Sequence, residues 1–156
     1  MSTLTDHAMP EIIESPPWPQ LDVPELTIGH RDFLRAAAHA ASIIPSVVHD
    51  ALVDFVDEVP QAGAIVLRGL PVGTLPLTPP SPTARTHKDH ISEFVLLTVS
   101  RRLGQPVGYL PEHGGDLVQN LVPTSLDADR QVSTSSKVDL MFHTEAAFHP
   151  HRPRYL

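Results

Sequence analysis

Seventeen prolines divide this 156-residue chain into stretches that can form regular structure and stretches that cannot. They cluster in residues 10–24 and again in residues 71–82. Proline has no backbone N–H, so it interrupts helix interiors and the hydrogen-bond ladders of central strands. We therefore expect residues 1–26 to form an extended, proline-rich arm that packs on the rest of the chain through Trp18 and Leu21. The second cluster is expected to form a surface loop.

The stretches between these clusters predict three helices. Apolar residues recur at helical spacing over residues 30–44 and again in the segment that Pro45 opens. A third helix is expected to run from an N-cap at Asp89 to Arg102, because a basic pair followed by Gly104 is typical of a helix C-terminus.

Strands are expected in the remaining aliphatic runs. Residues 63–73 have the composition of a buried strand. Further strands are expected at 106–110, 114–123 and 137–148, with a polar turn at Asp127–Arg130. Helices would then precede strands, and this segregation predicts an α+β fold. Residues 27–156 are expected to belong to a single domain.

Charge and cysteine content argue against several classes of function. The chain has 11 basic against 18 acidic residues and a formal charge of −7, which argues against a nucleic-acid partner. It has no cysteine, so disulfides, thiolate metal ligands and a cysteine nucleophile are excluded. No apolar run approaches the roughly 18 residues of a membrane span, and no signal peptide is visible, so we expect a cytoplasmic protein with no membrane contact.

A histidine and a carboxylate stand two residues apart near the end of the sequence. In "KVDLMFHTE", His143 and Glu145 would share one face of the expected strand. An imidazole and a carboxylate so placed can bind one divalent cation. Completed by another histidine, they would form the facial triad of non-haem Fe(II) oxygenases. His-x-Glu is a common pattern, however, and a hydrogen-bonded or solvent-exposed histidine is the plainer alternative.

Several motifs recur in order and resemble one family. The segments "GYLPEHGGDLVQNLVP" and "RQVSTSSKVDLMFHTEAAFHPHRPRYL" resemble the clavaminate synthase-like Fe(II)/2-oxoglutarate oxygenases. Within that family the resemblance is to the asparagine and arginine oxygenases, which hydroxylate a free amino acid at its β-carbon. It covers about Gly63 to Leu156. It implies Fe(II) as the metal, 2-oxoglutarate and dioxygen as cosubstrates, and a double-stranded β-helix (jelly roll) whose first strands follow the N-terminal helices.

The resemblance also implies site residues. His143 and Glu145 correspond to the first two iron ligands, and Glu145 is expected to touch the substrate amine as well. Gln119 corresponds to a glutamine that holds the α-amino group of the substrate. The run Ser133–Ser136 corresponds to a strand edge that lines the amino-acid pocket. The candidate substrate contacts in this run are Ser133, Thr134 and Ser135. Alternatively, Gln119 lies on the solvent face of a strand. The run could likewise be a turn whose side chains form hydrogen bonds with its own backbone.

Other histidines leave a second kind of chemistry open. His149 and His151 stand close together, but the resemblance implies that neither binds iron, and we expect His149 to pack beside the site. His113 is expected to border its entrance. If His149 or His151 joined the His-x-Glu pair, zinc-dependent hydrolysis would be the alternative. A non-catalytic binding module is the other alternative.

The family's remaining functional residues are expected downstream of Leu156. These are a second histidine ligand and the arginine that pairs with the far carboxylate of 2-oxoglutarate. We therefore expect this apparently truncated chain to be the N-terminal portion of an oxygenase, with most of the jelly roll absent.

Overall fold

The computed structural model describes residues 8–77, 88–111, 113–119, 121, 123, 127–132, 134–135, 137–139, 150–151 and 153–155. Its internal contacts divide the chain into two compact units. The helical unit consists of Met1–Gly73 and His90–Pro106. The loop unit consists of Thr74–Asp89 and Val107–Leu156.

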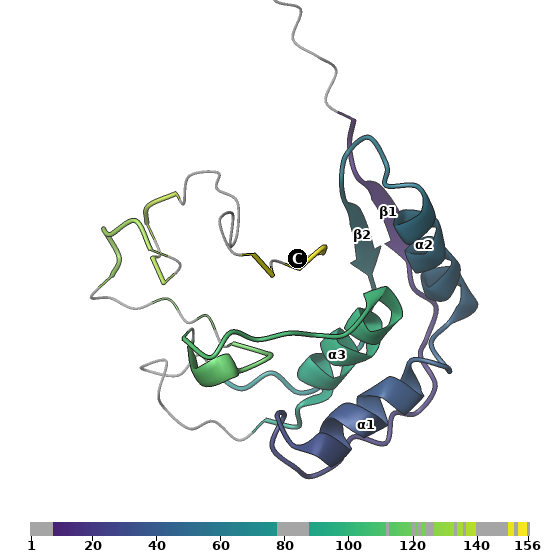
Figure 1. Ribbon diagram of the computed structural model, residues 1–156, viewed down its shortest axis with the longest axis horizontal. Helices are drawn as coiled ribbons and strands as arrows, with labels where there is room; N and C mark the ends of the chain where they lie inside the picture. Colours follow the sequence, from purple (N-terminus) through teal and green to yellow (C-terminus); the bar gives the residue numbers. More distant parts are fainter. Residues whose placement is uncertain are drawn as a thin grey trace, which may run out of the picture. The chain divides into compact units, whose positions relative to one another are not determined.

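Where the structure describes it, the helical unit contains two strands and three helices. In chain order they are β1 (Glu11–Glu14), α1 (Arg31–Ala40), α2 (Ser46–Asp57), β2 (Ile65–Arg68) and α3 (Ile91–Leu103). Figure 1 shows β1 and β2 side by side next to α2, and α1 packed along α3. All three expected helices are confirmed. The strand β1, which lies inside the proline-rich arm, was not predicted.

The ends of the helices follow local chemistry, with one exception. At the start of α1, Nδ1 of His30 accepts a hydrogen bond from the Asp32 amide at 3.2 Å. Leu103 is the last residue of α3 and Gly104 follows it, which confirms the expected end. The predicted N-cap at Asp89 is wrong, because His90 occupies that position with a left-handed φ of 56° and no side-chain cap bond. The Asp89 carboxylate instead accepts from the Thr74 amide at 2.7 Å.

The two strands pair in parallel. Glu11 lies opposite Ile65 and Glu14 opposite Arg68, and the latter two side chains form an ion pair at 3.0 Å. Parallel strands cannot be joined by a tight turn, so the connection between them is long and carries α1 and α2. The strand expected within residues 63–73 is confirmed as β2, but the prediction that it is buried is wrong. Its residues alternate between half-buried and exposed.

One apolar cluster joins most of these elements. Its buried members are Ile44, Val48 and Leu52, at or within α2. Half-buried apolar side chains from the arm, β2 and α3 pack against them; these are Trp18, Ile65, Leu67, Val99 and Leu103. Trp18 Nε1 also donates to Ser15 Oγ at 2.8 Å, so the arm packs through Trp18 as expected. The other residue expected to anchor the arm, Leu21, is half-buried.

A second contact holds α1 against α3. The rings of Phe33 and Phe94 meet edge to face, with centroids 5.5 Å apart and planes at 85°. Both residues are almost completely buried. This geometry directs the positive edge of one ring at the negative face of the other and adds to the energy of burial.

The loop unit differs most from expectation. The strands predicted at 106–110 and 114–123 are wrong for the residues that the structure describes there. His113–Gly115 form a short 3-10 turn instead. The backbone approaches itself so closely that a Cβ on Gly108 would lie 2.3 Å from the Gly115 carbonyl oxygen, and Gly115 has a φ of +85°. Glycine at both positions therefore allows the chain to fold back where an extended strand was expected.

Later parts of the loop unit are described only in short pieces. The predicted turn at Asp127–Arg130 is confirmed, with the Arg130 amide donating to the Asp127 carbonyl at 3.0 Å. In the strand expected at 137–148, residues 137–139 are not extended into a strand, and the others lie outside the described residues.

The described elements make a structure of mixed helix and strand. A strand that precedes the helices and pairs with one that follows α2 corrects the predicted segregation of helices from strands. The jelly roll stays a prediction. Among the described residues, no helix is both long enough and apolar enough to cross a membrane.

Substitutions in α2 should show how strongly the apolar cluster stabilises the helical unit. Val48→Ala removes methyl groups from a side chain that is 0% exposed, and we expect the free energy of unfolding to fall by about 2 kcal/mol. Val53→Ala is the matched control. Val53 lies in the same helix but is 41% exposed, and its substitution changes the helix propensity by the same amount as Val48→Ala. Its effect should stay within about 0.5 kcal/mol. Chemical denaturation measures both, and equal effects would contradict the assignment of the core.

Candidate functional site

The predicted metal ligands, His143 and Glu145, lie outside the described residues, as do Ser133, Ser136 and His149. Elsewhere in the chain, where the structure describes side chains, no group of three or more His, Asp or Glu residues could hold a metal ion. The donor chemistry of the predicted ligands fits a metal, since one imidazole and one carboxylate suit Fe(II) with open coordination positions.

Gln119, the predicted contact for the substrate amine, is exposed and does not lie in a strand. Its amide can donate and accept hydrogen bonds. The strand that would have placed Gln119 on a face opposite Val118 is absent from residues 113–119. Its role at the site stays a prediction.

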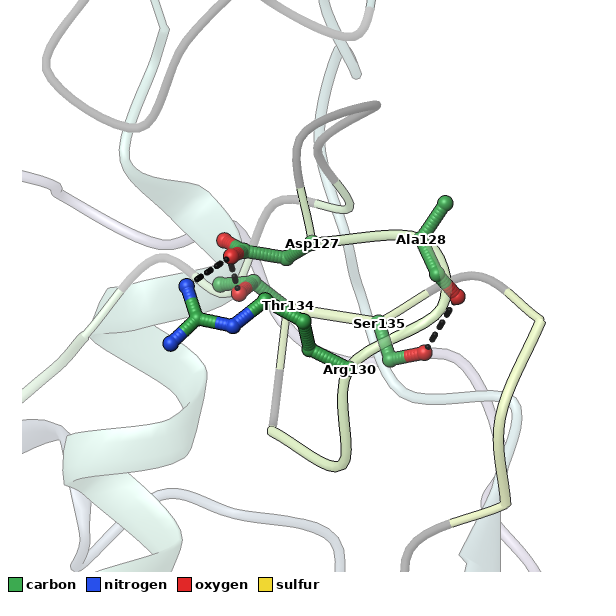
Figure 2. Close-up of polar contacts among 5 residues, drawn as sticks. All are labelled: Asp127, Ala128, Arg130, Thr134 and Ser135. Atoms are coloured by element: carbon green, nitrogen blue, oxygen red, sulfur yellow. Dashed lines mark hydrogen bonds and ion pairs between the residues drawn. The ribbon is translucent and has the colours of Figure 1, made fainter.

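Asp127 joins the turn at 127–130 to the predicted substrate run (Figure 2). Its Oδ1 accepts from Arg130 Nη1 at 2.9 Å, and its Oδ2 accepts from Thr134 Oγ1 at 2.9 Å. The Asp127 side chain is only 23% exposed, whereas that of Arg130 is 70% exposed. Each carboxylate oxygen thus has its own donor, which fixes the orientation of the carboxylate.

The Ser135 hydroxyl is fully used inside the chain. It donates to the Ala128 carbonyl at 2.9 Å, as Figure 2 shows, and accepts from the Val138 amide at 3.0 Å and the Lys137 amide at 3.4 Å. A hydroxyl has one proton and two lone pairs, so no capacity is left for a ligand. The Ser135 side chain therefore braces the segment, and a substrate contact from Ser135 would have to come from its backbone.

Asp127 and Arg130 were expected only to form a turn, and the bond from Thr134 to Asp127 was not predicted. A signal was present, since an acidic residue stands three positions before a basic one and shortly before a Ser/Thr run. Another ion pair in this segment, Lys137 Nζ with Asp129 Oδ1 at 3.6 Å, joins two largely exposed side chains. Such a pair contributes little to stability.

A tyrosine links the segment around residue 109 to the segment that follows the His-x-Glu motif in sequence. Tyr109 Oη donates to the His151 backbone carbonyl at 2.7 Å. His151 itself is exposed. Because the bond uses the backbone of His151, replacing the imidazole leaves it intact.

A pocket of about 330 Å³ lies in the helical unit between α2 and the sheet. Carboxylates and apolar side chains line it, among them Glu11, Asp54, Phe55 and Ile65. None of the residues predicted for the site lines this pocket.

No protein-family model matches the chain. The chain is nevertheless similar to the L-asparagine oxygenase of Streptomyces coelicolor, with 33% identity over 154 residues, which are 97% of this chain and 46% of that protein. It is also similar to clavaminate synthase 2 of Streptomyces clavuligerus, with 35% identity over 127 residues, 80% of this chain and 39% of that protein. The chain therefore spans less than half the length of these relatives.

A solved structure shows the same similarity in three dimensions. Asparagine oxygenase in complex with Fe(II), 2S,3S-3-hydroxyasparagine and succinate matches with a TM-score of 0.70 and 37% identity. The match covers 80% of this chain and 39% of that one. The similarity to asparagine oxygenase in sequence and in backbone structure thus extends over most of this chain.

Removing the bracing hydroxyl should loosen the segment locally. In Ser135→Ala the Val138 amide loses its acceptor, and we expect its hydrogen exchange to accelerate roughly fivefold to tenfold. Ser42→Ala is the control, because it removes another hydroxyl-to-carbonyl bond, from Ser42 Oγ to the His39 carbonyl, in the helical unit. Exchange at Val138 should not change in that control. An unchanged rate in Ser135→Ala would contradict the bracing role.

Proposed function

Because the chain belongs to the clavaminate synthase-like oxygenases, we propose that it forms part of a non-haem Fe(II)/2-oxoglutarate-dependent dioxygenase that hydroxylates a free L-amino acid. Asparagine, arginine or a similar amino acid is the proposed substrate, and the β-carbon is the proposed position. The observation that carries this proposal is the similarity to L-asparagine oxygenase over 97% of the chain. Since the chain covers only 46% of that relative, the proposal concerns the whole protein to which these residues contribute.

The chemistry of the matched complex supports the cofactor assignment. Its amino acid carries a hydroxyl on carbon 3, which is the β-carbon, and succinate is what remains of 2-oxoglutarate after loss of carbon dioxide. When bound, Fe(II) together with 2-oxoglutarate and dioxygen supplies the oxidising chemistry that converts a C–H bond into C–OH. The part of the protein is to hold the amino acid so that one C–H bond faces the metal.

The proposed roles within this chain are as follows. His143 and Glu145 would hold Fe(II) as imidazole and carboxylate ligands, and Glu145 would also reach the substrate amine. Gln119 would orient the α-amino group, because the amide oxygen of this exposed residue can accept a hydrogen bond from it. Ser133 and Thr134 would line the amino-acid pocket, and Ser135 would support them from behind.

The comparisons favour this activity over the zinc-dependent hydrolase and over the binding module that the histidine pattern left open. A jelly roll that continues beyond the described strands is part of the proposal. The arginine that anchors 2-oxoglutarate is expected in a region of the whole protein that corresponds to the part of the relatives not spanned by this chain. A cytoplasmic location stays a prediction.

The decisive test is amino-acid-dependent conversion of 2-oxoglutarate to succinate by the full-length protein. Glu145→Ala should lose bound iron and lower turnover at least a hundredfold, since a ligand oxygen is removed from the metal. Chelation should abolish turnover in the unmodified protein, and added Fe(II) with ascorbate should restore it. Iron content and succinate release are measured side by side.

His151→Ala is the matched control for the ligand assignment. Its imidazole has no role in the proposed iron site, and the bond from Tyr109 reaches its backbone, so iron content and turnover should stay within about twofold of the unmodified protein. Loss of metal in His151→Ala, with tightly held zinc in the purified protein, would instead support the hydrolase. Substrate-coupled succinate release retained by Glu145→Ala would overturn the ligand role of Glu145.

A further inference from the structure

The structure describes two members of the predicted substrate run, Thr134 and Ser135, and their hydroxyls are not equivalent. Ser135 has no hydrogen-bonding capacity left. Thr134 has committed its proton to the Asp127 carboxylate, which as an ionised group can only accept. No donor in the described part of the chain reaches Thr134 Oγ1, so its two lone pairs are available to a ligand.

The surroundings of Thr134 make it a strong acceptor. Its oxygen lies 2.9 Å from a carboxylate oxygen of Asp127, and a hydroxyl that donates to an anion is polarised into a better acceptor. The Asp127 side chain is mostly shielded from solvent, whereas the side chain of its ion-pair partner Arg130 is 70% exposed. Arg130 Nη1 thus holds the Oδ1 atom of the carboxylate, while its Oδ2 atom accepts from Thr134, as Figure 2 shows.

We propose that Thr134 accepts a hydrogen bond from an N–H group of the amino-acid substrate, and that Asp127 is the positioning residue that keeps Thr134 in this acceptor state. The inference rests on the proposed function, which places the run Ser133–Ser136 at the amino-acid pocket. A free amino acid offers such donors in its α-ammonium group and, for asparagine or arginine, in its side chain. Its α-carboxylate only accepts, and Thr134 has no proton to give it, so the carboxylate binds elsewhere.

Substitutions at Thr134 test the contact directly. Calorimetry on the Fe(II)- and 2-oxoglutarate-loaded full-length protein without oxygen, with L-asparagine and L-arginine as probes, gives the Kd of each variant. Thr134→Val keeps the shape but loses the acceptor, and Kd should rise roughly tenfold to a hundredfold, as for a lost hydrogen bond to a charged group. Thr134→Ser keeps the hydroxyl and should stay within about threefold. In turnover assays the loss should appear in KM, with kcat at saturation changed by less than about threefold.

Analogues without the α-amino group identify which N–H is bound. Succinamate is asparagine without that group, and 5-guanidinopentanoate is the corresponding analogue of arginine. If Thr134 binds the α-ammonium group, Thr134→Val should weaken the amino acids and leave the binding of the analogues unchanged. If it binds the side-chain N–H, both should weaken by the same factor.

A double-mutant cycle tests whether Asp127 acts through Thr134. Asp127→Ala releases the Thr134 proton and should also raise Kd at least tenfold. The double variant Asp127→Ala/Thr134→Val should then bind no more weakly than Thr134→Val alone, because the second change removes nothing further. Asp129→Ala is the matched control in the same turn. Its side chain is 81% exposed and pairs with the surface Lys137 at 3.6 Å, so Kd should not change.

Several outcomes would overturn the inference. Unchanged binding by Thr134→Val would remove the contact, and additive effects of Asp127→Ala and Thr134→Val would remove the positioning role. Failure of every L-amino acid to bind would end both this inference and the proposed substrate class. If an amino acid binds but no succinate forms, the proposed function fails alone, and the effect of Thr134→Val on Kd still decides the contact.

Discussion

The arm, β2 and α3 of the helical unit depend on an apolar cluster around Val48 and Leu52 of α2. Side chains from the arm, β2 and α3 pack against it, so burial of one cluster determines where several separate segments lie. The pairing of β1 with β2 follows from this, because an isolated two-stranded sheet is only marginally stable in water. Anchoring by Trp18 brings the arm to the cluster, and α2 covers one face of the strand pair.

Hydrogen bonding takes the place of burial in the described part of the loop unit. Apolar packing there involves Ala128, whereas the carboxylate of Asp127 and the hydroxyl of Ser135 fasten several backbone and side-chain groups. The hydrogen-bonding capacity of each group is limited, and a hydroxyl used to brace the chain is lost to a ligand. This limit separates Ser135 from Thr134, although the two are adjacent and chemically similar.

Helices were predicted well and strands poorly, for a physical reason. A helix closes its hydrogen bonds within a few residues, so periodicity and Gly104 suffice to locate α3. A strand needs a second strand as its hydrogen-bonding partner, and the local sequence does not identify that partner. The aliphatic runs at 106–110 and 114–119 were expected to pair but have no strand in the described structure, because the close approach of Gly108 to Gly115 turns the chain back on itself. The four residues of β1 were overlooked among prolines, although their partner β2 was recognised.

The sequence by itself determined the three helices, the absence of thiolate chemistry and the resemblance to one family of oxygenases, because each rests on local periodicity, composition or ordered motifs. It also named the run Ser133–Ser136 as a candidate substrate contact. Only the tertiary structure decided that β1 pairs with β2, and that Asp127 takes the proton of Thr134 while Ala128 takes that of Ser135. Those choices depend on groups that folding brings together from separate positions along the chain, and no local pattern encodes which donor meets which acceptor.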